Sequence, residues 1–243
     1  MKLYVVGLGP GEVSQMTGKA AEVIESCDTI VGYGVYTDLI SDLIKGKEVI
    51  TTPMKKEVDR CHMAVQAAIA GKNVAMVSSG DAGIYGMAGL IIEVLSEYEN
   101  HNVEVEVIPG ITAASSAAAV LGAPLTHDFA VISLSDLLTP WERIEKRLSL
   151  ASEAGFIICL YNPSSKKRAD YLKKACEIVM KNLPEETPCG FVQNIAREGQ
   201  KSRVLTLKEL AETQVDMFTT VVIGNETTKI IDGRLVTPRG YRK

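Results

Sequence analysis

The chain has 243 residues, of which 46% are hydrophobic and 23% are charged, with 20 glycines and a formal net charge of −4. A chain of this length and composition buries a core without disulfides or metals, which excludes disordered and collagen-like classes. The small negative charge excludes a global attraction to nucleic acid or anionic lipid, so any anionic ligand must be held by local cations.

The cysteines indicate a reducing compartment. There are five of them, Cys27, Cys61, Cys159, Cys176 and Cys189. The number is odd and no Cys-x-x-Cys pair occurs, so we expect neither a disulfide framework nor a thiolate metal site, and we interpret them as small core residues. The first residues lack a signal-peptide core, and no apolar run reaches membrane-spanning length. The sequence therefore predicts a cytoplasmic protein with no metal site and no membrane partner.

The first half of the chain alternates strand-like and helix-like segments. Runs of β-branched residues predict strands at 3–6, 29–31, 74–77 and 103–108, and apolar residues at helical spacing predict helices at 20–27, 58–70 and 84–98. Strands separated by helices usually lie parallel in one sheet. A helix of small residues, 111–121, ends at Gly122 with Pro124 beyond it, and there we place a domain boundary.

A second series of elements follows this boundary. Strands are predicted at 129–134, 156–161, 189–193 and 219–223, with helices that begin near Thr139, Ser165 and Leu207. Residues 229–236 read as a hairpin around Asp232-Gly233, which makes a mixed second sheet the expectation. The predicted fold is α/β, with two α/β domains at 1–122 and 123–243, a mostly parallel first sheet and a mixed second sheet.

The first predicted strand runs into the turn Gly7-Leu8-Gly9-Pro10-Gly11. Missing side chains let backbone approach a ligand closely, although an ordinary tight turn has the same composition. A dinucleotide fingerprint needs a third glycine where Glu12 stands, and this disfavours a nicotinamide-dependent oxidoreductase.

The most informative loop is 78–89, which reads Ser-Ser-Gly-Asp-Ala-Gly-Ile-Tyr-Gly-Met-Ala-Gly. It follows a buried-type strand, and open α/β sheets bind ligands at the carboxyl ends of their strands. Its free backbone groups suit an amino acid or adenosine, whereas Asp81 equally suits a helix N-cap. A third loop, Ile108-Pro109-Gly110-Ile111-Thr112, opens the small-residue helix, whose residues permit either close ligand approach or tight packing on a sheet.

In this order the three loops resemble the tetrapyrrole methylases, the class III methyltransferases. Three further stretches are similar to the C(17)-methyltransferase branch of that family. They are Val-Gly-Tyr-Gly-Val-Tyr at 31–36, Leu-Tyr-Asn-Pro-Ser-Ser-Lys-Lys-Arg at 160–168, and His-Asp-Phe-Ala-Val-Ile-Ser-Leu-Ser-Asp-Leu-Leu-Thr-Pro-Trp-Glu at 127–142. The resemblance covers essentially the whole chain.

The resemblance implies a homodimer whose protomers hold S-adenosylmethionine in a cleft between two α/β domains and release S-adenosylhomocysteine. Carried over residue by residue, it implies cofactor contacts by Pro10, Ser79, Gly80, Asp81, Ile84, Thr112, Ala113, Asn162, Ile195 and Gly224. The position of Asn162 is often methionine in the wider family.

The implied reaction is methylation of carbon 17 of precorrin-3B or cobalt-factor III, coupled to ring contraction, in cobalamin biosynthesis. Ring contraction requires proton movement, for which His127 with Asp128 is the first candidate, because imidazole titrates near neutrality. Tyr33, Tyr36 and Asp136 are further candidates, and a structural role for His127 is the alternative.

The substrate implied by the resemblance is an anionic tetrapyrrole with many carboxylates, so an acidic protein needs a local cationic rim. The candidates are Arg143, Lys166, Lys167, Arg168 and Arg197, whereas Lys173, Lys174 and Lys181 read as a solvated helix face. Trp141 has two interpretations: its ring contacts the macrocycle, or it packs the first helix of the second domain against the core.

Competing functions are methylation of another precorrin carbon, of diphthamide or of ribosomal RNA, and a non-catalytic module that binds a tetrapyrrole or nucleotide. The lack of a basic surplus opposes a nucleic-acid partner.

Overall fold

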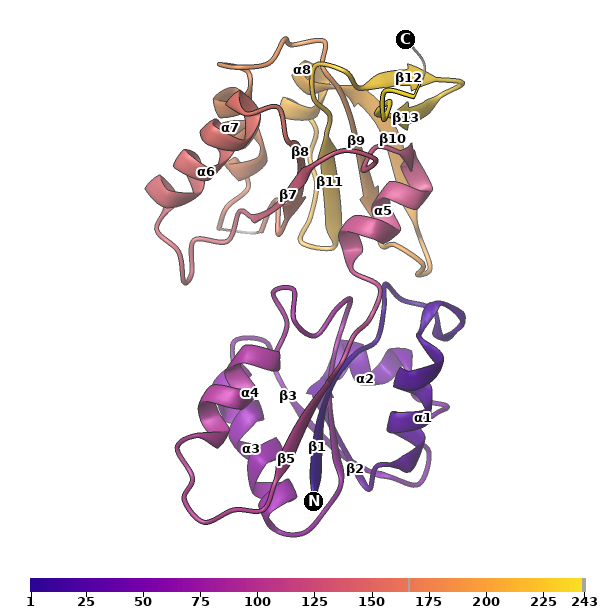
Figure 1. Ribbon diagram of the computed structural model, residues 1–243, viewed down its shortest axis with the longest axis vertical. Coiled ribbons are helices and arrows are strands. Elements are labelled where there is room, and N and C mark those ends of the chain that lie inside the picture. Colours follow the sequence, from indigo (N-terminus) through magenta and orange to yellow (C-terminus); the bar gives the residue numbers. More distant parts are fainter. Residues whose placement is uncertain (166, 242–243) are drawn as a thin grey trace. The chain divides into compact units, whose positions relative to one another are not determined.

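A computed structural model describes residues 1–165 and 167–241, and its chain divides into two compact units, Met1–Ala113 and Ala114–Lys243 (Figure 1). Each unit is described by itself. No helix in these described ranges is long and apolar enough to cross a bilayer. Within the same ranges, no three His, Cys, Asp or Glu side chains are grouped so that they could hold a metal ion.

The first unit is a five-stranded, wholly parallel sheet with strand order β3-β2-β4-β1-β5. Its elements are β1 (Lys2–Gly7), η1 (Val13–Gln15), α1 (Gly18–Ser26), β2 (Thr29–Tyr33), α2 (Gly34–Leu39), β3 (Glu48–Thr52), α3 (Glu57–Ile69), β4 (Val74–Ser78), α4 (Ala88–Leu95) and β5 (Glu104–Ile108). The predicted parallel sheet is confirmed. Two elements were not predicted: β3, an edge strand in which three of the five residues are exposed, and the short helix α2.

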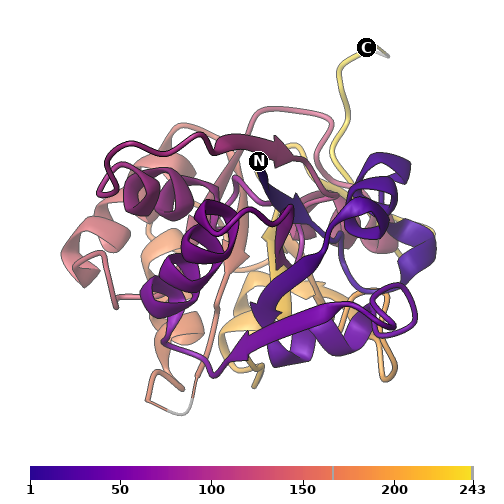
Figure 2. The same ribbon diagram turned by 90° about the horizontal axis from the view of Figure 1, so that it is seen from below.

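Helices cover both faces of this sheet, as the view in Figure 2 also shows. One core cluster packs α3 and α4 against residues such as Val5, Val31 and Met76. The other packs α1 against residues such as Val6, Ile30 and Val77. Successive strand residues point to opposite faces, so alternate residues of one strand enter different cores.

The second unit holds a mixed five-stranded sheet with order β10-β9-β11-β8-β7. Its elements are α5 (Ala113–Leu121), which begins at the boundary, β6 (Gly122–Ala123), β7 (Phe129–Ser133), α6 (Trp141–Glu153), β8 (Ile157–Tyr161), α7 (Tyr171–Val179), β9 (Pro188–Gln193), β10 (Lys201–Thr206), α8 (Leu207–Ala211), β11 (Thr219–Ile223), β12 (Lys229–Ile231) and β13 (Arg234–Val236). The predicted mixed character is confirmed, because β7 and β8 are parallel whereas β11 is antiparallel to both of its neighbours.

The hairpin predicted around Asp232-Gly233 is present as β12 and β13, yet it does not join the five-stranded sheet. Strand β13 pairs instead with β6, directly after α5. Helix α5 itself packs on the second sheet, since a Cβ on Gly190 of β9 would lie 2.7 Å from Leu121 Cδ2. These contacts explain why α5 belongs to the second unit, although the boundary after Gly122 assigned it to the first.

All five cysteines are buried free thiols. Burial raises the pKa of Cys27 and Cys61 to about 11, and the pKa of Cys159 and Cys176 to about 12. Because only the thiolate reacts with alkylating agents, these groups are inert near neutrality.

We therefore expect iodoacetamide at pH 8 to label no cysteine of the native protein within minutes and all five after denaturation, as counted by mass spectrometry. A cysteine that reacts at the rate of a free thiol would contradict the buried core role.

Candidate functional site

Three loops meet at the carboxyl edge of the first sheet, after the neighbouring strands β4, β1 and β5. The loops after β1 and β4 are joined by two backbone hydrogen bonds, from Gly9 N to Gly80 O at 3.0 Å and from Gly80 N to Gly9 O at 2.8 Å. Leu8 N also donates to Ser78 O at 2.8 Å. Beyond the parallel strands, the two loops thus form an antiparallel bridge, which fixes their backbone.

Two glycines are required by this loop packing. A Cβ on Gly110 would lie 2.1 Å from Gly80 O, and a Cβ on Gly7 would lie 2.6 Å from the same oxygen. Gly80 differs, because its φ of +69° favours glycine while no atom lies within 3.8 Å of the Cβ position. The space beside Gly80 is therefore open, whereas Gly7, for whose turn a close approach to a ligand was predicted, serves contact between loops, as Gly110 does.

Asp81 ties two of these loops together. Its Oδ1 accepts a hydrogen bond from Gly83 N at 2.8 Å, and its Oδ2 accepts one from Gly110 N at 3.0 Å. The alternative of a helix cap is wrong, because α4 begins at Ala88 after Met87 and has no side-chain cap. The same observation corrects the predicted helix start at residue 84. Through these hydrogen bonds, the Asp81 carboxylate holds loop 78–89 against the Pro109-Gly110 turn.

The order of the strands is one that favours a ligand site at this place. The chain leaves β1 through α1 on one face of the sheet, and it leaves the adjacent β4 through α4 on the opposite face. Loops that diverge from neighbouring parallel strands open a crevice at the carboxyl ends, the usual ligand site of open α/β sheets. At this edge the structure brings together the predicted cofactor residues of the first unit, which are Pro10, Ser79, Gly80, Asp81, Ile84, Thr112 and Ala113.

Ser78 gives an independent sign of a ligand at this edge. Its hydroxyl is the one buried side-chain polar atom without a hydrogen bond in the described part of the chain. A buried hydroxyl left without a partner is costly, and such groups cluster at functional sites. Ser78 Oγ therefore has hydrogen-bonding capacity that the described protein atoms leave unused, next to the open side of Gly80.

In the second unit, two predicted cofactor residues lie at the edge where β7, β8 and β9 end. Asn162 follows β8 with a φ of +52°, and its Nδ2 donates to Ser133 Oγ at 3.0 Å. Ile195 follows β9 between two residues of positive φ, Asn194 and Ala196. At the same edge, Tyr161 Oη accepts a hydrogen bond from Ala114 N at 2.7 Å, which anchors the start of α5.

Gly224 does not join them. It follows β11, which is antiparallel to β8 and β9, so it lies at the opposite edge of the sheet. Five strand residues separate the two edges by about 17 Å. A Cβ on Gly224 would lie 2.6 Å from the side chain of Thr228. Packing against Thr228 explains this glycine, and the geometry does not support a shared ligand contact with Asn162.

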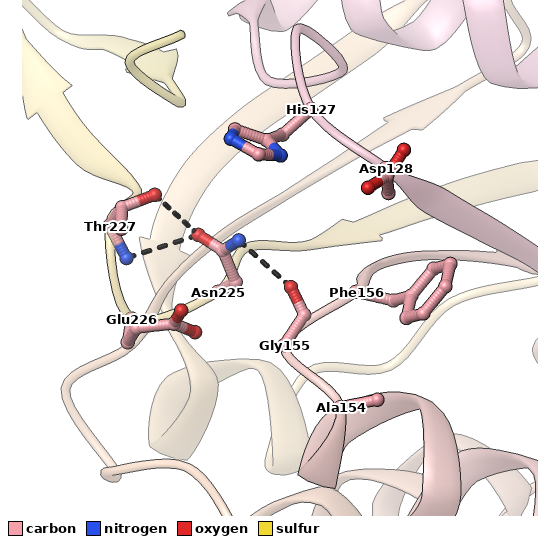
Figure 3. A pocket seen from close by; sticks show the side chains of 8 residues that line it. All are labelled: His127, Asp128, Ala154, Gly155, Phe156, Asn225, Glu226 and Thr227. Atoms are coloured by element: carbon pink, nitrogen blue, oxygen red, sulfur yellow. Dashed lines mark hydrogen bonds between the residues drawn. The ribbon is translucent and has the colours of Figure 1, made fainter. Parts of the chain in front are cut away.

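His127 and Asp128 also lie at this opposite edge, directly before β7. Figure 3 shows them lining a pocket with Gly155, Phe156 and the segment 225–227. Asn225 organises this pocket, since its Oδ1 accepts hydrogen bonds from Thr227 N and Oγ1 and its Nδ2 donates to Gly155 O at 2.9 Å. The proposed catalytic pair is therefore one strand length from Asn162, and the structural alternative for His127 is favoured.

Tyr33, the third catalytic candidate, ends β2 at the carboxyl edge of the first sheet. Its ring meets Tyr36 edge-to-face at 5.3 Å between centroids. The guanidinium of Arg60 lies 5.9 Å from the Tyr33 ring centroid. Sequence reasoning missed Arg60, although one signal was available: it lies four residues before Ala64, on the buried face of α3.

Asp136 forms an internal scaffold. It accepts a hydrogen bond from Tyr171 Oη at 2.6 Å and pairs with Arg168 Nη1 at 3.2 Å, while Arg168 also donates to Ser135 Oγ. The hydrogen bond from Tyr171, together with Arg168, lowers the pKa of Asp136. The ring centroids of Trp141 and Tyr171 lie 4.4 Å apart, and Trp141 packs on the core. The interpretation that Trp141 packs the first helix of the second domain is confirmed. A carboxylate held ionised in this way is a poor proton carrier near neutrality.

The other predicted cations are placed as follows. Arg197 lies 6.0 Å above the Phe218 ring, and Lys166 falls outside the described residues. Lys173 and Lys174 form exposed ion pairs with Glu212 and Asp170, as a solvated face requires.

Comparison with known proteins agrees with the loops. The family model of the Tetrapyrrole (Corrin/Porphyrin) Methylases matches residues 2–211. This chain belongs to that family. It is 47% identical over 239 residues to a probable cobalt-factor III C(17)-methyltransferase of Salmonella typhimurium, covering 98% of this chain and 99% of the relative. It is 42% identical over 249 residues to a precorrin-3B C(17)-methyltransferase of Sinorhizobium sp, covering 98% and 96%.

A solved structure of the methyltransferase CobJ superposes with a TM-score of 0.90 at 35% identity, over 97% of this chain and 99% of that one. The family and the α/β class predicted from the sequence are thereby confirmed. The chain is an S-adenosylmethionine-dependent methyltransferase of the tetrapyrrole methylase family.

Loop packing gives a first test of the site. Gly110→Ala places a methyl group 2.1 Å from Gly80 O, so we expect the loops to separate, with a loss of several kcal/mol of stability and at least tenfold weaker binding of S-adenosylhomocysteine. The matched control is Gly89→Ala, in helix α4, where no atom lies within 4 Å and alanine favours the helix. Calorimetry and thermal unfolding measure both effects. Equal behaviour of the two variants would refute the packing role.

The Asp136 scaffold gives a prediction on pH. Its pKa is lowered, so the stability it supplies is present above the ordinary Asp value, about 3.9, and is lost as the pH falls through the lower folded value. We expect Asp136→Asn to lower the thermal midpoint by a few degrees at pH 7, with the difference shrinking below about pH 4. Asp170→Asn, which removes an exposed ion pair, is the control and should change little. A difference in thermal midpoint that does not depend on pH would contradict this role of Asp136.

Proposed function

We propose that this methyltransferase transfers the methyl group of S-adenosylmethionine to carbon 17 of cobalt-factor III or precorrin-3B, coupled to ring contraction, in cobalamin biosynthesis. The observation that carries the proposal is near full-length similarity to relatives named for this reaction, with 47% and 42% identity. The higher identity belongs to the relative named for cobalt-factor III, so we propose the cobalt pigment as the better substrate. S-adenosylhomocysteine is the expected product.

For the cofactor, we propose the carboxyl edge of β4, β1 and β5. The residues that would hold it are Ser79, Gly80, Asp81 and Thr112, with Pro10, Ile84 and Ala113 at the same edge. Backbone groups there match the polar groups of an amino acid and a ribose, and the buried Ser78 Oγ behind them has no hydrogen-bond partner among the described residues. Asn162 and Ile195 remain predicted contacts, and Gly224 is no longer proposed.

Methyl transfer from a sulfonium is an in-line displacement whose leaving group departs neutral. The protein must therefore align donor and acceptor and exclude water, and it needs no nucleophilic side chain. Among the proton-transfer candidates, Tyr33 shares the sheet edge with the cofactor loops, whereas His127 and Asp128 do not share an edge with Asn162. We propose Tyr33 as the group that assists ring contraction.

A homodimer in the cytoplasm, with an anionic tetrapyrrole as the partner and neither nucleic acid nor membrane, remains a prediction from the family resemblance.

The test is anaerobic turnover of purified protein with S-adenosylmethionine and, in parallel, cobalt-factor III and precorrin-3B. We expect one S-adenosylhomocysteine per pigment, with a spectral change and a higher rate on the cobalt pigment. Reactions without pigment give the background. Cofactor binding without turnover of either pigment would leave the fold standing and exclude the C(17) reaction.

A further inference from the structure

The remaining half of the same sheet edge holds a buried cation. Arg60, in the first turn of α3, is only 4% exposed. Its Nε donates to Thr52 Oγ1 at 2.8 Å, and its Nη2 donates to Pro53 O at 3.1 Å. Both partners are uncharged. Among residues 1–165 and 167–241, no carboxylate forms an ion pair with Arg60.

The carboxylates nearest in sequence are engaged elsewhere. Glu57 Oε1 accepts a hydrogen bond from Lys55 N, and Asp59 pairs with Lys56 at 2.9 Å on the exposed side of the helix. A guanidinium out of water without a counter-ion is costly, and the positive end of a helix dipole adds to the cost. Among the described residues, the charge of Arg60 therefore meets only neutral hydrogen-bond acceptors and the Tyr33 ring.

The guanidinium has a donor left for an anion. The hydrogen bonds of Arg60 to the described residues use Nε and Nη2. Nη1 is not a buried atom without a partner, because Ser78 Oγ alone has that status in the described part of the chain. Nη1 therefore keeps some solvent-accessible surface, although Arg60 as a whole is only 4% exposed.

Strand alternation places Arg60 over a row of polar side chains. Ile50, Val31 and Met76 face the core on the side of α3, so Thr52, Tyr33 and Ser78, two residues further along β3, β2 and β4, share that face. Neighbouring strands lie about 4.8 Å apart, so the row spans roughly 10 Å. Its Ser78 end adjoins the proposed cofactor loops, and its Thr52 end carries Arg60.

We propose that Arg60 binds one carboxylate of the tetrapyrrole substrate and so orients the macrocycle at the β3-β2 half of the edge, beside the cofactor at the β4-β1-β5 half. This inference rests on the proposed function and names a specificity residue for it. The guanidinium supplies a charge-assisted hydrogen bond through Nη1, and the Tyr33 ring flanks it.

The test uses Arg60→Met and Arg60→Lys in the complete protein, with Lys45→Met as the control. Lys45 is an exposed lysine paired with Asp42, so its replacement removes one positive charge away from this edge. We expect Arg60→Met to raise the KM for cobalt-factor III roughly 10- to 100-fold and to leave S-adenosylhomocysteine affinity and saturated kcat within about twofold. Arg60→Lys, which keeps the charge and protects the fold, should fall between. The control should match the native enzyme.

Salt separates a charge contact from a purely structural role. The KM of the native enzyme should rise with NaCl more steeply than that of Arg60→Met. Unchanged pigment KM in a folded Arg60→Met or Arg60→Lys enzyme would overturn the proposal, and so would an equal loss of S-adenosylhomocysteine binding. Native enzyme that turns over neither pigment would instead mark failure of the proposed function itself, and with it this inference.

Discussion

The close approach of three backbone loops is the constraint on which the first unit depends. Parallel strands β4, β1 and β5 are neighbours, so their carboxyl-end loops emerge side by side and must share one small volume. Gly7 and Gly110 let the backbones touch, and the two carboxylate oxygens of Asp81 bind the loops together. A rim held in this way keeps its backbone groups in a fixed geometry, which is what catalysis by positioning requires.

Two arginines of this acidic chain have opposite charge environments. Arg168 is neutralised by Asp136 and serves a scaffold that includes Tyr171. Arg60 is more deeply buried and meets only neutral partners, Thr52 and Pro53. Since an unpaired buried charge is tolerated where a ligand completes it, the unpaired arginine points to substrate and the paired one to architecture.

The stretches that characterise the C(17) branch have different structural roles. Ser135 and Asp136 meet Arg168 and Tyr171 in one cluster of hydrogen bonds, and the Tyr171 ring lies tilted against the Trp141 ring. His127 begins the stretch 127–142. It precedes β7, whereas Ser135 and Asp136 follow that strand, so His127 lies at the opposite edge of the sheet from them. Proximity in a motif therefore did not mean proximity in space, because an extended strand moves the chain about 3.3 Å per residue.

The sequence by itself determined the family, the α/β alternation and the loops of the first unit, because glycine spacing and β-branched runs are local signals. It also indicated a mixed second sheet, although through a hairpin that pairs with β6. Only the tertiary structure separated Gly224 and His127 from Asn162, since strand direction depends on pairing between distant segments. It also decided that Arg60 lacks a carboxylate partner among the described residues, because burial and charge pairing are properties of packed neighbours and not of sequence position.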